Sequence, residues 1–165
     1  MPMRRKDREV SNKEEIKRII EKCKVCHLAM VDKGLPYVVP LNFGFILDDN
    51  SLTLFFHSAK TGRKLDILKE NNAVCFEMAW EGKLGHVENP CNSGYYFASV
   101  HGFGRVEFME DINEKCNALA LLAKHQSGQD FVFTEKQADS ACVYKVVSTD
   151  FTGKKKLNPK GAPLS

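Results

Sequence analysis

The sequence predicts an α+β fold, mainly β, in which about six strands form a small barrel with helices at its edges. Short stretches rich in β-branched and aromatic residues recur along the chain, separated by Gly, Asn and Asp turns. Stretches with the apolar spacing of a helix stand between them. The 165 residues match one domain of about 100–200 residues. With 43% apolar residues, the chain can build a packed core.

The first half of the chain contains one predicted helix and three predicted strands. The letters SNKE at 11–14 have the form of a capping box, and apolar residues follow at 16, 19, 20 and 23, so a helix is expected over 12–23. Strands are expected at 27–32, 37–45 and 52–57, the last two pairing as a hairpin. Proline cannot donate to a strand ladder, so Pro40 predicts an edge, a bulge or a ligand-facing gap.

The second half alternates helices and strands in the same way. A helix is expected over 58–69, with Leu65 and Leu68 on its buried side, followed by a strand at 73–79 and a loop at 82–94. A long strand at 95–109, bent near its glycines, leads to a helix that begins at Asp111. A loop at 126–130 and a strand at 141–151 complete the single domain, 1–165, whose residues 152–165 are expected to form a mobile basic tail.

Composition excludes several function classes. The net charge of +3, from 24 basic and 21 acidic side chains, is too mild to predict nucleic-acid binding. No apolar run approaches the ~18 residues of a membrane span, so no membrane partner is expected. The basic N-terminus lacks the apolar stretch of a signal peptide, which predicts a cytoplasmic protein with its six cysteines reduced.

Two segments carry the chemistry, YVVPLNFGF at 37–45 and FFHSAKTGRK at 55–64. Where a strand runs into a helix, unpaired backbone N–H groups favour a phosphate. Hydroxyls and three basic side chains (Lys60, Arg63 and Lys64) stand at this point, and the neighbouring strand offers peptide groups to a flat heteroaromatic ring. A lysine-rich first turn is also common as a solvated surface that opposes the helix dipole. The residues alone leave both interpretations open.

With the MRRKDRE opening at 3–9 and the strand YFASVHG at 96–102, these segments resemble the pyridoxamine 5′-phosphate oxidase-like flavoproteins. Within that superfamily the chain is most similar to the nitroimidazole-resistance (Nim) branch, over roughly residues 3–155. The resemblance implies an FMN-binding split β-barrel that forms a homodimer, with two FMN sites each built from both subunits. The flavin would carry out the redox chemistry, and the protein would position and tune it.

The resemblance also assigns roles by position. It places Pro40, Leu41 and Asn42 along the isoalloxazine, and His57, Ser58 and Ala59 along the ribityl chain and ring edge. It places Lys60, Arg63 and Lys64 at the phosphate. It assigns Tyr95, Tyr96 and Ser99 to the partner subunit. His57 is the candidate catalytic residue, as a proton donor to the reduced substrate. The alternative is a histidine that only hydrogen-bonds the cofactor.

The leading functional hypothesis is a flavin-dependent oxidoreductase. It would take electrons from a nicotinamide donor that binds transiently and would reduce small electron-poor compounds such as nitroimidazoles. One alternative is a non-catalytic flavin-binding or storage protein, and another is a split barrel that uses haem or a deazaflavin. Oxidation of pyridoxamine phosphate itself is not favoured, because no second set of basic residues for a substrate phosphate is evident near the C-terminus.

No metal site is expected. Cys23 and Cys26 have CxxC spacing, but zinc normally needs a second pair of ligands, and buried apolar cysteines fit the end of a helix better. His86 and Cys91 flank a loop, with a metal interpretation that is equally weak. Trp80 is expected either against the flavin or at the dimer interface.

Overall fold

The computed structural model describes residues 3–84 and 94–156. Within them, one strand-rich sheet is accompanied by four α-helices and a short 3₁₀ turn. In chain order the elements are η1 (Lys6–Arg8), β1 (Glu9–Val10), α1 (Lys13–Lys22), β2 (Cys26–Asp32), β3 (Leu35–Leu41), β4 (Gly44–Leu47), β5 (Leu52–Ser58), α2 (Arg63–Glu70), β6 (Ala73–Leu84), β7 (Tyr95–Phe108), α3 (Ile112–Ser127), α4 (Glu135–Asp139) and β8 (Cys142–Lys156).

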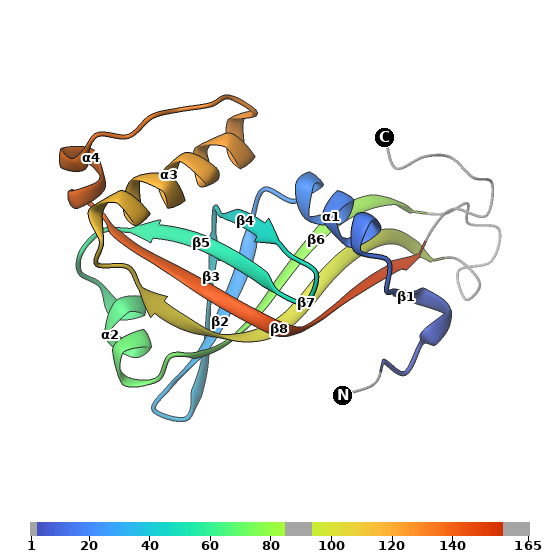
Figure 1. Ribbon diagram of the computed structural model, residues 1–165. Coiled ribbons are helices and arrows are strands. Elements are labelled where there is room, and N and C mark those ends of the chain that lie inside the picture. The colour runs from blue at the N-terminus through green and yellow to red at the C-terminus, as the bar shows by residue number, and fades with distance from the viewer. Residues whose placement is uncertain (1–2, 85–93, 157–165) are drawn as a thin grey trace.

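The sheet is antiparallel and runs in the order β3-β2-β6-β7-β8-β5-β4, with β1 added to the free part of β8. Its two terminal strands, β3 and β4, follow each other in the chain and are separated only by Asn42 and Phe43. The chain therefore passes directly from one end of the sheet to the other, and no ladder joins these two edges. This is the arrangement of a split barrel, which confirms the predicted α+β, mainly β, fold class (Figure 1).

The core has two layers. The barrel interior is filled by apolar side chains from most strands together with α1 and α2. A second cluster lies on the outer face of β5 and β8, where α3 and α4 pack. The outer face of β3, β2 and β7 instead leaves Val31, Val38 and Phe103 about half exposed, at 48%, 58% and 52%. Helices therefore cover one side of the barrel, and among the described residues an apolar sheet face remains on another.

Several predictions about strands were wrong. The described residues form eight strands rather than six, and the predicted strand 37–45 divides into β3 and β4. The hairpin consists of β4 and β5, whereas β3, which carries Pro40, pairs only with β2 and lies at the sheet edge. The division has a packing cause: a β-carbon on Gly44 would lie 2.6 Å from the backbone nitrogen of Leu122, so β4 touches the α3 backbone and leaves the line of β3.

Helix boundaries also needed correction. Asn12, not Ser11, caps α1, and its side chain accepts from the Glu15 amide at 3.0 Å. The helix expected from residue 58 begins at Arg63, because Ser58 still belongs to β5. Asp111 caps α3 as predicted. The helix α4 was not predicted.

The expected loop and tail are partly strand. Residues 82–84 belong to β6, and residues 152–156 belong to β8, where they pair with β7 and β1. Residues 157–165 lie outside the described residues, as do His86 and Cys91. No helix in the described part of the chain has the length and apolarity needed to cross a membrane.

Candidate functional site

The turn between β5 and α2 leaves the start of α2 uncapped. Gly62 occupies the N-cap position at φ 142°, with no side-chain cap, and its carbonyl accepts from the amides of Leu65 and Asp66. The amides of Arg63 and Lys64 precede these bonds and are among the unsatisfied donors of a helix start. A β-carbon at Gly62 would meet nothing within 4 Å, so the space outside the turn is open. These features suit an anion.

Three cations lie at this turn, and each has different interaction partners. The Arg63 guanidinium donates twice to Asp32 Oδ2, at 2.9 and 2.8 Å, and lies 4.6 Å from the Tyr37 ring centroid. Lys60 pairs with Asp139 of α4 at 3.4 Å. Lys64 is half-buried, burial lowers its pKa, and no carboxylate within the described residues contacts it. Lys64, whose Nζ lies 5.8 Å from the Tyr144 ring centroid, is therefore the cation of these three that no carboxylate of the described residues engages.

His57 lies at the end of β5, beside this turn. Burial against its neighbours and then the Lys64 ammonium lower the pKa of His57, which keeps the imidazole neutral near pH 7. A neutral imidazole offers one donor and one acceptor. Ser58 uses its hydroxyl to donate to the Ala59 carbonyl at 3.0 Å. The structure thus brings His57, Ser58, Ala59, Lys60, Arg63 and Lys64 to one turn.

The Pro40–Asn42 segment is held mainly by Asn42. Its Nδ2 donates to the Lys24 carbonyl and to Gln126 Oε1, both at 3.0 Å, and Gln126 Nε2 donates to the Phe43 carbonyl at 2.9 Å. The amide nitrogen that was expected to face a flat ring is therefore engaged within the chain. Asp32, Tyr37 and Gln126 were missed as residues supporting the site, since no local motif links them to it.

His125 stabilises the same junction between β3 and β4. Its Nε2 donates to the Cys23 carbonyl at 2.8 Å, and its ring lies 4.7 Å from Phe43 and 5.2 Å from Phe45 between centroids. Burial lowers its pKa, so the unfolded chain binds this proton more tightly than the folded chain. The free energy of unfolding should therefore decrease as the pH falls below about 6.5.

This pH dependence is measured by denaturant unfolding between pH 8 and 5. A His125→Gln variant should show a flatter profile than the parent, and His57→Gln should remove the part that comes from the proposed site. A parent profile that is flat from pH 7 to 5 would contradict the assignment.

The residues expected from a partner subunit lie elsewhere in this chain. Tyr95, Tyr96 and Ser99 begin β7 at the end of the barrel opposite α2 (Figure 1). A single chain therefore does not bring them to the turn at Gly62. Trp80, on β6, lies 5.2 Å from the Lys22 ammonium between ring centroid and Nζ.

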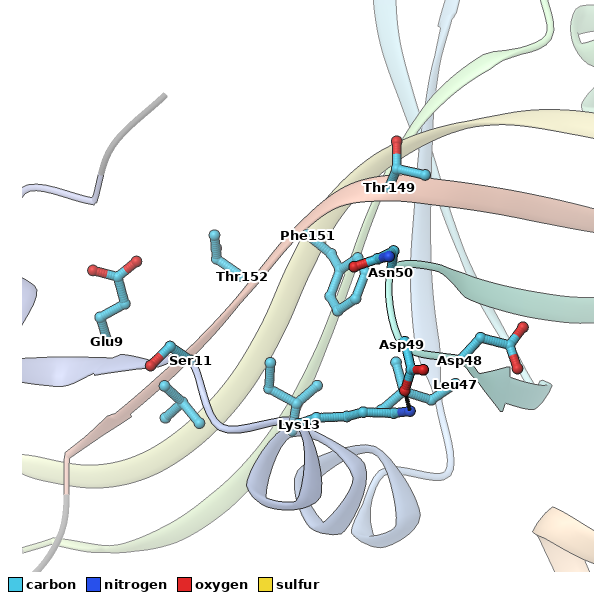
Figure 2. Close-up of a pocket in the computed structure, with 12 residues that line it drawn as sticks. Glu9, Ser11, Lys13, Leu47, Asp48, Asp49, Asn50, Thr149, Phe151 and Thr152 are labelled. Carbon is cyan, nitrogen blue, oxygen red and sulfur yellow. Dashed lines mark hydrogen bonds and ion pairs between the residues drawn. The ribbon is translucent and has the colours of Figure 1, made fainter.

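The described residues also form cavities beside and away from this turn. A pocket of about 420 Å³ beside Lys60 is lined by parts of α2, α3, α4 and β8. A pocket of about 320 Å³ lies where β1 and α1 meet the β4–β5 turn (Figure 2). Its lining includes Glu9, Asp48 and Asp49, and Lys13 already pairs with Asp49 at 2.7 Å, so it repels a phosphate.

The CxxC cysteines are buried as predicted. Burial raises the pKa of Cys23 to about 12 and also raises that of Cys26, which makes both poor metal or redox groups. No group of three metal-ligating side chains occurs among residues 3–84 and 94–156.

The open antiparallel barrel defines a split-barrel protein. The chain belongs to the pyridoxamine 5′-phosphate oxidase family, whose sequence profile matches residues 12–155.

Among solved structures, a candidate 5-nitroimidazole antibiotic resistance protein from Bacteroides thetaiotaomicron VPI-5482 is 33% identical, with a TM-score of 0.76. The match covers 89% of this chain and 86% of that one. An FAD and heme binding protein from Mycobacterium smegmatis is 16% identical, covering 92% and 74%, with a TM-score of 0.78. The flavocytochrome Anf3 from Azotobacter vinelandii is 20% identical, covering 96% and 73%, with a TM-score of 0.77. The last two likenesses concern the fold. No curated protein matches the chain.

Proposed function

We propose that this protein is an FMN-binding oxidoreductase that reduces small electron-poor compounds such as nitroimidazoles. The observation that carries the proposal is the uncapped start of α2, with open space at Gly62 and the half-buried Lys64 beside it. Family membership and the 33% identical candidate nitroimidazole-resistance protein support it. The flavin-binding and haem-binding relatives share the fold at lower identity.

The donor set at the turn fits a phosphate monoester. Two backbone amides, the Lys64 ammonium and the Arg63 guanidinium are the groups that bind phosphate in proteins. Asp32 competes for Arg63, so a phosphate would share or replace that carboxylate. When bound, FMN supplies hydride and electron transfer. Lys64 would hold the phosphate, while the neutral His57 N–H would orient the ribityl chain or donate a proton to a reduced substrate.

The proposal includes a homodimer that uses the uncovered sheet face. Val38, Ala29, Cys75 and Phe103 form one cross-strand row on β3, β2, β6 and β7. Its two ends are more than half exposed, at 58% for Val38 and 52% for Phe103. A second copy of the chain is the occupant, because Tyr95 and Ser99 share the face of β7 that carries Phe103 and, with Tyr96 next to them in the strand, would then reach the partner's cofactor turn.

Val38→Glu and Phe103→Glu together should therefore weaken dimerisation by about 100-fold or more, since a carboxylate left unpaired in an apolar interface costs several kcal/mol. Light scattering across a concentration series measures this. Val132→Glu is the matched control, because Val132 is 96% exposed on the segment between α3 and α4. A parent protein that is monomeric at all concentrations would refute the dimer.

The test of the function is the absorption spectrum of the purified protein, followed by anaerobic mixing. FMN predicts flavin bands and a released cofactor that chromatographs as FMN. Haem or a deazaflavin would give a different spectrum and would refute the cofactor. Loss of the visible flavin absorbance on adding a nicotinamide donor, and its return on adding a nitroimidazole, would support the reductase. A bound flavin that no donor reduces identifies a binding or storage protein instead.

A further inference from the structure

Basic side chains gather at the end of the barrel opposite α2. The short ladder between β1 and β8 places Glu9 opposite Lys154 and so joins the N-terminal segment to the end of the last strand. Seven cations result, a group we call the basic end: Arg4, Arg5, Lys6, Arg8, Lys154, Lys155 and Lys156. The whole chain has a net charge of only +3, so its excess positive charge is concentrated here.

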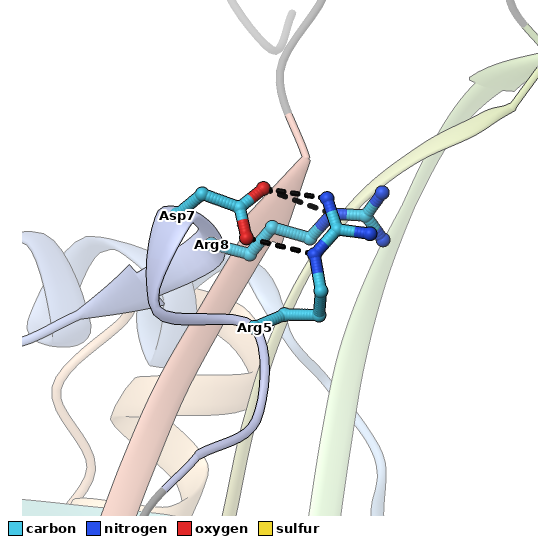
Figure 3. Close-up of polar contacts among 3 residues, drawn as sticks. All are labelled: Arg5, Asp7 and Arg8. Carbon is cyan, nitrogen blue, oxygen red and sulfur yellow. Dashed lines mark hydrogen bonds and ion pairs between the residues drawn. The ribbon is translucent and has the colours of Figure 1, made fainter.

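Carboxylates neutralise only part of this positive charge. Asp7 accepts from Arg5 at 2.7 and 2.6 Å and lies 3.9 Å from Arg8, so one carboxylate holds two guanidinium groups side by side (Figure 3). The Arg5 guanidinium lowers the pKa of Asp7 to about 2, which keeps this carboxylate charged at working pH. Lys155 pairs with Glu15 of α1.

Two of the remaining cations lie over aromatic rings instead of acids. Lys154 Nζ is 5.9 Å from the Phe97 ring centroid, and Lys156 Nζ is 5.9 Å from that of Tyr96. Neither lysine has a carboxylate partner among the described residues. Beside them, Tyr95 is 46% exposed. Ammonium groups next to partly exposed rings suit a ligand that has both phosphates and flat heterocycles.

We propose that the basic end binds the phosphates of the nicotinamide dinucleotide donor and selects the form with the additional phosphate monoester. The inference rests on the proposed function, in which Tyr95 and Tyr96 reach the cofactor of the partner subunit. A donor held by Lys154 and Lys156 would then lie beside that cofactor. The extra monoester adds about −1.5 to −2 charge and matches the cations that no carboxylate neutralises.

The basic end fits a small ligand better than a nucleic acid. A nucleic-acid surface needs a long basic stripe, whereas this cluster is confined to one end of the barrel. The guanidinium groups of Arg5 and Arg8 already contact Asp7, so the two lysines over aromatic rings are the cations left for a phosphate. Lys154 and Lys156 stand two positions apart on β8, so they share one face of the strand.

The experiment is calorimetric titration of the purified protein with NADP⁺, NAD⁺, adenosine 2′,5′-bisphosphate and pyrophosphate. The parent should bind NADP⁺ about tenfold or more tightly than NAD⁺, with an affinity that falls as salt rises. The variant Lys154→Ala/Lys156→Ala should lose that preference. The control Lys69→Ala/Lys136→Ala removes the same charge from α2 and α4 and should retain it. Thermal melts check that all variants fold.

Three results would overturn the inference. They are equal affinity of the parent for NADP⁺ and NAD⁺, an undiminished preference in the Lys154/Lys156 variant, and pyrophosphate binding as tightly as NADP⁺. Flavin content is measured separately in each preparation and should not change in either double variant. A protein without flavin that still shows the lysine-dependent NADP⁺ preference would refute the proposed function and leave this binding site supported.

Discussion

Replacing Arg63 and Lys64 together with alanine is expected to release the flavin and leave the purified protein colourless. Each charge-assisted hydrogen bond to a phosphate contributes roughly 1.5–3 kcal/mol, so two lost side chains should weaken cofactor binding by about 10²–10⁴-fold. The measurement is flavin absorbance per protein, together with the dissociation constant for added FMN.

Two controls separate binding from folding. Asp32→Asn breaks the Arg63–Asp32 pair and leaves both cations, so it should keep the flavin or bind it more tightly. Lys69→Ala removes a charge from the last turn of α2 and should change nothing. The Arg63–Asp32 pair is largely exposed at Arg63 (62%), so its loss should change stability by only about 0–1 kcal/mol. Full flavin occupancy in the double variant would show that the phosphate site lies elsewhere.

Gly44→Ala should strongly lower the free energy of unfolding. A β-carbon at this position would lie 2.6 Å from the Leu122 nitrogen and 2.7 Å from its Cα, both backbone atoms of α3. Since backbone cannot rotate away, α3 must shift from the sheet, which costs about 3 kcal/mol or more. For a chain of this size the melting temperature should fall by about 6–12 °C. Because Gln126 of α3 holds Asn42, flavin affinity should decrease as well.

The matched control is Gly94→Ala. The atom closest to a β-carbon there is Lys156 Nζ, the far end of a flexible side chain that can move at little cost. Its melting temperature should stay within about 2 °C of the parent. Equal melting temperatures for the two variants would mean that α3 does not pack on Gly44 as described. Calorimetry or circular dichroism at one scan rate measures both.

Local signals in the sequence predicted most elements but not their partners. The period of apolar residues at 16, 19 and 20 placed α1, and Asp111 correctly marked the start of α3. The strand pairing predicted for 37–45 was wrong, because a continuous run of β-forming residues gives no local sign of the junction at Asn42 and Phe43. That junction depends on the contact between Gly44 and the α3 backbone, about 80 residues further along the chain.

The candidate site divides along the same line. The proposed phosphate-binding part lies in one continuous segment, 57–64, and the prediction rests on strand-to-helix geometry and residue type within that segment. Its remaining parts are brought in by long-range contacts. Asp32 reaches Arg63 from the end of β2, and Gln126 reaches Asn42 from α3.

The fold class, the core-facing pattern and the basic turn follow from the amino-acid sequence alone, because each depends on neighbouring residues and on the period of apolar side chains. Three further properties depend on the tertiary structure: which strands form the split, which cations lack a carboxylate partner among the described residues, and the pairing of β1 with β8 that joins the basic side chains of both segments. Those properties depend on contacts between residues distant in sequence, where the free energy of packing and of charge pairing is set by three-dimensional proximity.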